Sequence, residues 1–404
     1  MNINLEDKNF IQNPHPYLDE LRKTNPIFLY SDNSILITGY KECEEILKRE
    51  EIGFLTNVKK EDESWFSLMD KKDKHSLVLQ FEKSKQFNLK TLAFKNPPEH
   101  TRLKKLFLKA FRKTAIEDLT IAIETICNKL TDELKNNEEI ELINDFCKPF
   151  TTNVILYLMG YKGNDGDYLS ELSDDLLNSM SINASVEEKK KGIESKMLWA
   201  KKAKEIFDNP ALISNDGLLH YLRYKTSENE ISEDEFISNS ALLIMAGQVT
   251  TQAFIGSCVY YFLKNKISLT EDNINKGMQE VLRLEPPNLY ITKFVRNDFE
   301  YKGFKFTKGN KVNFFISAAN RDDKIFENNH EFVLNRAFNP NISFGSGVHY
   351  CIGAFLALKE TEIALKKLFQ VFPNWKMKNN EILWEDTIRT RCLQNLYLIN
   401  DSEN

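Results

Sequence analysis

The apolar and polar positions along most of the chain alternate with helical spacing. From Pro97 onward, apolar residues recur every three or four positions over long segments, which predicts α-helices. These segments are 98–112, 115–135, 143–160, 167–180, 187–207, 214–225, 233–264, 271–284 and about 352–369. The acidic residues 233–235 would interact favourably with the positive end of the dipole of the long helix. Pro286 and Pro287 would end the following helix.

A smaller part of the pattern predicts β-structure. The runs PIFLY and SILITGY, separated by the turn-like residues 31–33, predict a hairpin, and a helical segment, KECEEILKRE, follows them. We expect residues 55–95 to form a long, partly irregular connection. FEYKGFKF, the turn 307–310 and KVNFFIS predict strand, turn and strand. The pattern, without repeats, predicts a mainly α fold with a small β region, in one domain spanning 1–404.

Composition narrows the class of protein. The net charge of −5 argues against a nucleic-acid binder that relies on positive charge. We find no secretory signal, no membrane anchor and no apolar stretch of 18 residues, so a cytoplasmic protein without a membrane partner is expected. The six cysteines lack CxxC pairs, which argues against a disulfide framework or a structural zinc site and fits a reducing cytoplasm.

The sharpest chemical signal is the segment FGSGVHYCIG, residues 344–353, directly before a helical run. Gly345 and Gly347 allow a tight backbone turn. Cys351 would lie near the unpaired N–H groups at a helix start, which favours the thiolate that a metal needs. Taken alone, the segment could also be a glycine-rich turn around a buried cysteine.

These ten residues resemble the haem-binding loop of cytochromes P450, FGxGxHxCxG, at every fixed position. The resemblance implies a soluble bacterial-type haem-thiolate monooxygenase with the triangular, mainly α fold of that family. It also implies haem b with Cys351 as axial thiolate, Phe344 beside the sulfur, His349 at a propionate, and Gly345, Gly347 and Gly353 in the loop. An axial thiolate favours O–O cleavage.

A second signal is the pair Glu280 and Arg283, which share a helix face at spacing i, i+3. By itself the pair could be a weak surface ion pair. It resembles the family's ExxR helix, whose third partner would be Arg336. The resemblance implies a buried charge network that holds the cysteine loop in place.

The segment KNPPEHTRLKKLF resembles the family's xPPEHxRxR segment, although its charges could simply form a solvated helix face. The resemblance implies that His100 and Lys104, one helical turn apart, hold a propionate, with Lys104 where arginine is usual. A lysine replaces the bidentate fork by a point charge. Arg296 resembles the family's other propionate arginine.

The middle of the segment 233–264 carries AGQVTT, residues 246–251. Helical spacing puts Leu243, Ala246, Gly247, Thr250 and Phe254 on one face. The small residues could mark a close helix–helix contact, or they could leave room for haem and O2. The segment resembles the family's oxygen-activation motif AGxETT, which implies that Ala246 and Gly247 border the haem and that Thr250 steers protons to dioxygen.

Val249 replaces the usual acid of that motif and cannot relay a proton. Gln248 lies about 100° around the helix, so we do not expect it to substitute. Our hypothesis is proton delivery through Thr250 with ordered water or a polar group of the substrate. The alternatives are peroxide-driven turnover, or a non-catalytic haem protein acting as sensor or carrier.

The expected reaction inserts one oxygen atom of O2 into a small organic substrate, or performs a related coupling or desaturation, as in secondary metabolism. Family topology gives the candidate pocket residues Trp65, Phe66, Met69, Leu243, Ala246, Leu289, Tyr290 and Cys392. Each of these side chains could equally belong to the core. Whether the substrate is free or bound to a carrier protein stays open.

Redox partners are suggested by a basic cluster on one short helix of this acidic chain. The cluster consists of Arg102, Lys104, Lys105, Lys109, Arg112 and Lys113. In the family this helix borders the proximal haem face. We expect it to steer an acidic ferredoxin or flavodoxin, which with its reductase would supply electrons to a monomeric enzyme.

Overall fold

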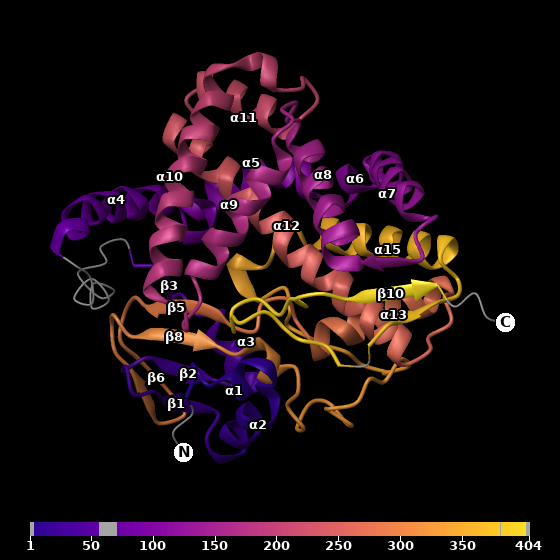
Figure 1. The fold of residues 1–404 in the computed structure, drawn as a ribbon. Helices are drawn as coiled ribbons and strands as arrows, with labels where there is room; N and C mark the ends of the chain where they lie inside the picture. Colours follow the sequence, from indigo (N-terminus) through magenta and orange to yellow (C-terminus); the bar gives the residue numbers. More distant parts are fainter. Residues whose placement is uncertain (1–3, 56–70, 380, 401–404) are drawn as a thin grey trace. The chain divides into compact units, whose positions relative to one another are not determined.

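The computed structural model describes residues 4–55, 71–379 and 381–400 and is 56% helical (Figure 1). The chain forms two compact units from interleaved segments. The first unit comprises Met1–Ile52, Phe111–Thr151 and Val249–Asn404, and the second comprises Gly53–Ala110 and Thr152–Gln248. A single domain over 1–404 stays a prediction.

The first unit contains helices and most of the β-structure. Its helices are α1 (Lys8–Gln12), α2 (His15–Thr24), α3 (Tyr40–Ile46), α6 (Lys113–Asp118), α7 (Thr120–Leu134), the π-helix η3 (Ile143–Cys147), α13 (Glu271–Leu284), α14 (Ile316–Ala319), the 3-10 helix η5 (Gly347–His349) and α15 (Ala354–Val371). Helix α15 packs against α7, α6 and α13.

Three sheets accompany these helices. The main sheet has the order β1 (Ile27–Leu29), β2 (Ile35–Ile37), β8 (Lys311–Phe314), β5 (Ile291–Val295) and β3 (Ile52–Gly53). A second sheet has the order β4 (Glu139–Glu141), β10 (Tyr397–Asn400) and β9 (Trp375–Met377), and β6 (Phe299–Tyr301) pairs with β7 (Phe304–Phe306). The main sheet buries Ile37, Val312 and Phe314 in a core cluster with Cys43 and Ile46 of α3.

The second unit is built from helices. They are α4 (Lys71–Lys90), the 3-10 helix η2 (Leu92–Phe94), α5 (Glu99–Phe111), α9 (Gly166–Ser179), α10 (Val186–Asp208), η4 (Pro210–Leu212) and α11 (Leu218–Ser227). Helices α9 and α10 approach closely because α10 carries Gly192, where a Cβ would lie 2.1 Å from the side chain of Ser179. Helices α8 (Lys148–Met159) and α12 (Glu233–Lys264) each contain residues of both units.

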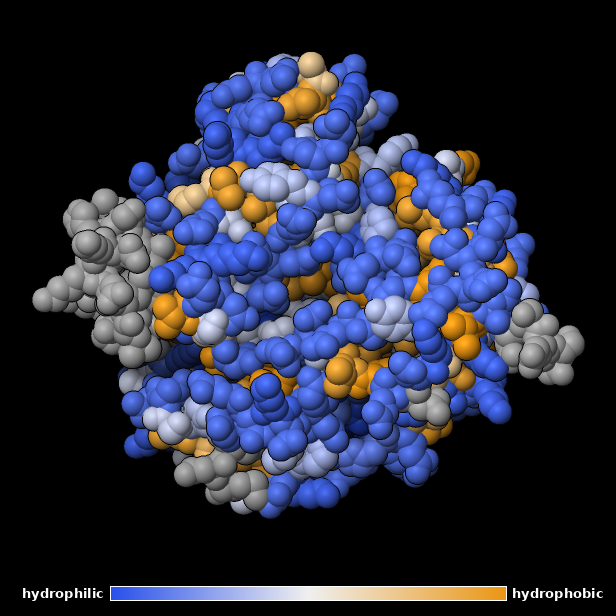
Figure 2. Space-filling model, viewed as in Figure 1, coloured by the Kyte–Doolittle hydropathy of each residue, from blue (hydrophilic) through white to orange (hydrophobic). Residues whose placement is uncertain are grey.

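Helix α12 is apolar around most of its circumference. It is long and apolar enough to cross a membrane by length and composition, so the expectation that no 18-residue apolar stretch exists is wrong. Inside the protein 78% of its apolar window is buried, which is typical of a central core helix. Polar residues cover most of the protein face seen in Figure 2, with small apolar areas between them.

Most predicted elements are present, and α12 and α13 match their predicted bounds. The hairpin β1–β2 is also confirmed. The irregular connection over 55–95 is wrong in part, because residues 71–90 form α4. The predicted turn over 307–310 is present, because the N–H of Asn310 donates to the carbonyl oxygen of Thr307 at 2.9 Å. The strand predicted before it is divided by a further turn at 302–303 into β6 and β7, and β8 joins the main sheet.

Candidate functional site

The loop before α15 is folded tightly around two glycines. Gly345 and Gly347 have φ values of 76° and 71°, in the left-handed region that side chains other than glycine rarely adopt. A Cβ at Gly347 would also lie 3.1 Å from the carbonyl oxygen of Leu47. The backbone N–H of Cys351 donates to the carbonyl oxygen of Phe344 at 2.9 Å and closes the loop.

Cys351 differs from the other cysteines in its exposure. Cys43, Cys127, Cys147, Cys258 and Cys392 are buried, whereas Cys351 is exposed, and none of the six forms a disulfide. Burial raises the pKa of Cys127 to about 12 and those of Cys43, Cys147 and Cys258 well above the usual value. The interpretation of Cys351 as a buried structural cysteine is therefore wrong.

The surroundings of Cys351 fit a planar metal cofactor. The thiol lies three residues before the first residue of α15, close to the helix start. A Cβ at Gly353 would lie 4.0 Å from the sulfur, so glycine keeps this side of the thiol open. Within the described ranges, no group of three or more His, Cys, Asp or Glu residues could hold a metal ion. A metal held through one thiolate needs a ligand such as a porphyrin to supply its other bonds.

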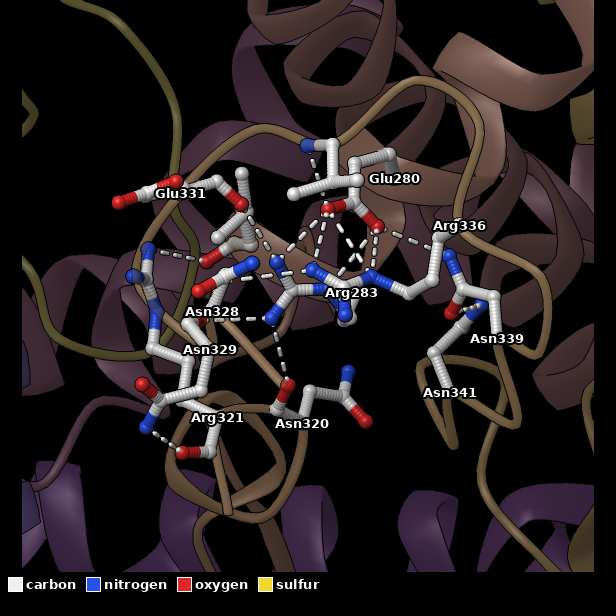
Figure 3. A network of polar contacts seen from close by, with 12 residues as sticks. Glu280, Arg283, Asn320, Arg321, Asn328, Asn329, Glu331, Arg336, Asn339 and Asn341 are labelled. Carbon is white, nitrogen blue, oxygen red and sulfur yellow. Dashed lines mark hydrogen bonds and ion pairs between the residues drawn. The ribbon is translucent and has the colours of Figure 1, made fainter. Parts of the chain in front are cut away.

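Glu280 lies at the centre of a buried polar network (Figure 3). Arg283 donates to both carboxylate oxygens of Glu280, at 2.9 and 2.8 Å. The guanidinium group of Arg336 also donates to both oxygens, with its Nε 3.0 Å from Oε2 and its Nη2 3.0 Å from Oε1. The backbone of Val333 and the amide of Asn339 complete the set around the carboxylate.

The network links α13 to the chain that leads into the cysteine loop. Arg283 also donates to the carbonyl oxygens of Asn320, Asn329 and Glu331. Burial acts to raise the pKa of Glu280, but the hydrogen bonds from Arg283 and Arg336 outweigh it and lower the pKa. The alternative of a weak surface pair is wrong, since Arg283 is fully buried.

Helix α5 carries His100 and Lys104 one turn apart, as predicted. His100 is buried and Lys104 is partly exposed. Two residues of the basic cluster interact with other residues of the second unit. Arg102 forms an ion pair with Glu235 of α12, and the Lys109 ammonium lies 4.2 Å from the centre of the Tyr221 ring.

Arg296 follows the last residue of β5. Its backbone N–H donates to the carbonyl oxygen of Glu51 at 2.7 Å, and its guanidinium group donates to that of Glu50 at 3.1 Å. The side chain therefore helps to fix the segment before β3. Its predicted role at a propionate stays a prediction.

The middle of α12 is less buried than its surroundings. Ala246 is exposed and Gly247 and Thr250 are partly exposed, whereas Val249 is buried. A Cβ at Gly247 would lie 2.7 Å from the Ile155 side chain of α8, so this glycine also serves a close helix contact. Both interpretations of the small residues have support.

The side chain of Gln248 points away from position 249, where the family's AGxETT motif has its acid. Its amide nitrogen donates to the hydroxyl of Ser170 on α9, and both residues are buried. This bond occupies the amide nitrogen within the helical unit, whereas the amide oxygen has no hydrogen-bond partner among the described residues. Gln248 therefore does not take the place of the missing acid.

The predicted pocket residues have mixed positions. Trp65, Phe66 and Met69 lie outside the described residues. Leu243, Leu289, Tyr290 and Cys392 are buried. Within the first unit, residues 389–390 pair with residues 288–289. The N–H of Leu289 donates to the carbonyl oxygen of Arg389, and Asn288 forms an isolated β-bridge with Thr390. The sulfur of Cys392 lies 3.7 Å from the amide nitrogen of Gln252.

Several buried ionisable residues were not identified from the sequence, and Lys293 and Glu360 are two of them. Lys293 interrupts the apolar run ITKFV of β5, and Glu360 lies in the apolar run of α15. They are 6% and 0% exposed. The sequence did contain a signal for both residues, because each places an ionisable side chain where the apolar pattern of its strand or helix predicts a core residue.

Comparison with known proteins identifies the family. A family model described as cytochrome P450 matches residues 274–387. Cytochrome P450 CYP107DY1 of Priestia megaterium is 31% identical over 86% of this chain and 85% of its own length. The biotin biosynthesis cytochrome P450 of Bacillus subtilis is 27% identical over 96% of both chains.

The fold agrees with this family. P450BioI, solved in complex with hexadec-9Z-enoic acid ligated acyl carrier protein, matches with a TM-score of 0.87 and 26% identity over 97% of this chain and all of that chain. The polyketide synthase cytochrome P450 PksS of Bacillus subtilis matches with a TM-score of 0.82 and 26% identity over 98% of this chain and 99% of that chain. The predicted mainly α fold with a small β region is confirmed. With these relatives and the loop that presents Cys351, the chain belongs to the cytochrome P450 family of haem-thiolate monooxygenases.

Proposed function

We propose that this cytochrome P450 oxidises an acyl chain that is bound to an acyl carrier protein, with electrons from a separate ferredoxin or flavodoxin and its reductase. The observation that carries the oxidase assignment is the exposed Cys351 in its glycine-closed loop before α15. When bound, the haem supplies the activation of dioxygen. We place the protein in the cytoplasm, as a monomer.

Each site residue has a role in this proposal. Cys351 would hold the iron as thiolate, and His100, Lys104, Arg296 and His349 would hold the propionates. Ala246 and Gly247 leave room beside α12. The hydroxyl of Thr250 moves protons toward the oxygen substrate, with ordered water or a polar substrate group replacing the acid that Val249 cannot supply.

The substrate class follows from the relatives. The structure of P450BioI holds a fatty acid ligated to an acyl carrier protein, and PksS is named for polyketide biosynthesis. Both are aligned over nearly the whole of this chain.

Optical titration of the haem protein tests this assignment. A substrate that displaces water from the iron shifts the Soret band, so hexadecenoyl acyl carrier protein, the free acid and unloaded carrier can be compared directly. We expect the loaded carrier to bind at least about tenfold more tightly than the free acid, a difference of about 1.4 kcal/mol. Mass spectrometry of the released chain should then show one added oxygen atom. Equal affinity for the free acid, or no shift with the loaded carrier, would contradict carrier presentation.

The apolar Val249 favours a second candidate, peroxide-driven turnover, because peroxide brings both oxygen atoms and needs fewer delivered protons. Turnover with hydrogen peroxide alone is compared with turnover using NADPH and a ferredoxin pair. We expect faster product formation with the redox pair. Faster turnover with peroxide would favour the second candidate, and NADPH consumption at the background rate with no product in either assay would favour a haem sensor or carrier.

A further inference from the structure

Two buried side chains of α10 carry hydrogen-bond donors that lack acceptors. Lys196 is 9% exposed and Trp199 is 0% exposed. The indole nitrogen of Trp199 has no hydrogen-bond partner among the described residues. Lys196 forms no hydrogen bond or ion pair with a described residue either, and burial is the only cause that acts on its pKa. Buried polar groups are nearly always paired, so two adjacent exceptions need an explanation.

The two side chains are neighbours on one face of α10. Residues three positions apart in an α-helix have Cβ atoms about 5–6 Å from each other. Gly192, four positions before Lys196, and Ala203, four positions after Trp199, continue this face and are also buried. The face therefore presents two donors between two small residues.

This face is turned toward the interior of the second unit. On one side, the hydroxyl of Ser195 donates to Asp175 of α9 at 2.9 Å, and Gly192 adjoins Ser179 of the same helix. Helix α4 also packs against α10 (Figure 1). The donors of Lys196 and Trp199 are therefore enclosed by helices of their own unit.

Carboxylates on these neighbouring helices have other partners. The two carboxylate oxygens of Asp175 are used by Lys191, at 2.7 Å, and by Ser195. In the described part of α4, Glu82 pairs with Lys85 at 3.1 Å. The interior of this helical unit thus has a lysine without a counter-charge from these two acids.

The charge of Lys196 is largely retained. Burial lowers its pKa to about 8, because the ammonium form loses hydration, and no charged group is among the causes. At neutral pH most of the protein therefore holds an ammonium group at this buried position. A negative group brought beside it would be stabilised strongly, because the surroundings screen the charge poorly.

The types of the two side chains define the group that they can bind. Lysine and the tryptophan indole are donors only, so a ligand must supply an acceptor to each of them. A carboxylate has two acceptor oxygens and the negative charge that matches the ammonium group. An acyl chain has such a group as the free acid. On a carrier protein the thioester uses this group, and the chain then needs a second one.

The same unit carries part of the oxygen-activation motif. Ala246 and Gly247 of α12 belong to it, and the adjacent Gln248 donates to Ser170 of α9. Helix α9 therefore connects this part of α12 with α10. A ligand bound at Lys196 lies in the unit that also carries these two small residues.

We propose that Lys196 and Trp199 form a subsite for a carboxylate of the substrate, so that this P450 acts on an acyl chain that bears an acid group. The inference rests on the proposed function and adds the acid group as a requirement. The carboxylate accepts hydrogen bonds from the Lys196 ammonium and from the indole N–H of Trp199.

Calorimetric titration of the purified haem protein tests the subsite, because it needs no optical change at the iron. The probes are hexadecenoic acid, its methyl ester, hexadecenoyl acyl carrier protein, and carrier protein loaded with hexadecanedioic acid through one of its two acid groups. The variants are Lys196→Met, which keeps a long side chain without charge, and Trp199→Phe, which keeps a ring without N–H. Lys201→Met, exposed on the same helix, is the matched control.

We expect Lys196→Met to weaken the binding of a probe with a free carboxylate by about tenfold or more, because a charged hydrogen bond is lost. Trp199→Phe should weaken the same probe severalfold, and Lys201→Met should bind it as wild type does. The methyl ester and the hexadecenoyl carrier, which have no carboxylate on the chain, should bind equally to wild type and Lys196→Met. Because Lys196→Met removes an unpaired buried charge, it should fold at least as stably as wild type.

The two acid probes distinguish the source of the carboxylate. Weakening of the free acid alone by Lys196→Met assigns the subsite to the head group of a free acyl substrate. Weakening of the acid-terminated carrier assigns it to a second carboxylate at the far end of a carrier-bound chain. If Lys196→Met binds both acid probes as tightly as wild type, or if Lys201→Met weakens them equally, the proposal is overturned.

Failure of the subsite can be told apart from failure of the proposed function. If the loaded carriers bind more tightly than the free acid and Lys196→Met changes nothing, only the subsite is wrong. If Lys196→Met weakens the free acid but neither carrier binds better than that acid, the subsite stands and carrier presentation is wrong.

Discussion

At the residue scale, Glu360 is the most unusual acid of α15. It is 0% exposed, and neither carboxyl oxygen has a hydrogen-bond partner within the described part of the chain. Burial raises the pKa of Glu360 well above its usual value. The folded protein therefore holds a proton at Glu360 at pH values where the unfolded chain has released it.

Stability should fall with rising pH because of this group. Between the pKa of Glu360 in the unfolded chain and its higher pKa in the folded protein, the folded state binds more protons than the unfolded state. The stability of the folded protein is therefore greatest below the unfolded-state pKa and falls as the pH rises toward the folded-state pKa. The neutral variant Glu360→Gln should match wild type near pH 4. It should gain about 1.4 kcal/mol in relative unfolding free energy for each pH unit above that, up to the folded pKa. Urea unfolding of the haem protein at several pH values measures this gain.

Glu362→Gln on the same helix is the control. Although burial opposes it, hydrogen bonds from Lys366 and Lys359 lower the pKa of Glu362, so its removal should give no alkaline gain. A flat difference between wild type and Glu360→Gln across the pH range would show that Glu360 has a partner.

Val249 is the residue that limits proton delivery in our proposal. Introducing an acid by Val249→Glu should raise the fraction of NADPH electrons that is recovered in product by about tenfold or more with non-native substrates. This gain is smaller than the 10²–10⁴-fold rate enhancement that a general acid usually contributes. Burial at this position would raise the pKa of the new carboxyl and keep more of it protonated. Val249→Gln keeps a polar group without the acid and should give no gain; an unchanged yield with Glu would contradict the missing relay.

The sequence predicted the motif residues and, through the family resemblance, the buried pairing of Glu280 with Arg283 and Arg336, but not the backbone carbonyl groups that Arg283 binds. Cys351, Glu280, Arg283 and Arg336 were identified because their types and spacing form a specific pattern. Lys293 and Glu360 were missed because burial of a charged side chain depends on elements distant in sequence.

At the element scale, the chain between α13 and the cysteine loop is held by one carboxylate. Glu280→Gln would leave Arg283 and Arg336 facing each other without the charge between them. Breaking such a buried set costs about 3–5 kcal/mol. We expect a matching loss in unfolding free energy by urea denaturation, and a lower haem content in the purified protein.

Asp272→Asn on the same helix is the matched control, because Asp272 pairs with Lys276 at the surface. Its loss should cost less than about 1 kcal/mol. Similar losses for the two variants would mean that the Glu280 network does not carry the stability of this region.

Helices with a full apolar pattern and clear end signals could be predicted well. The acids at the start of α12 and the prolines after α13 mark bounds that the structure confirms. Helix α4 was missed because its apolar residues have weak helical periodicity among many charges. The pairing of β8 with β2 and β5 could not be predicted, because it joins strands that are far apart in the chain.

At the scale of the whole molecule, the net charge of −5 makes the basic α5 a local exception. Arg102 and Lys109 have partners within the protein, and Lys105 is exposed. Lys105→Glu should lower the turnover rate with an acidic ferredoxin severalfold at low salt, with a smaller effect at high salt. Lys201→Glu, exposed on α10, should leave the rate unchanged; equal effects of both would argue against docking at α5.

The oxidase assignment depends on a thiolate bond from Cys351 to the haem iron. The most direct measurement is the absorption spectrum of the purified protein after reduction and exposure to carbon monoxide, for wild type and Cys351→Ala. We predict a Soret band shifted far to the red in wild type and absent in the variant. An ordinary haem–carbon monoxide spectrum in wild type, or no haem at all, would contradict the assignment.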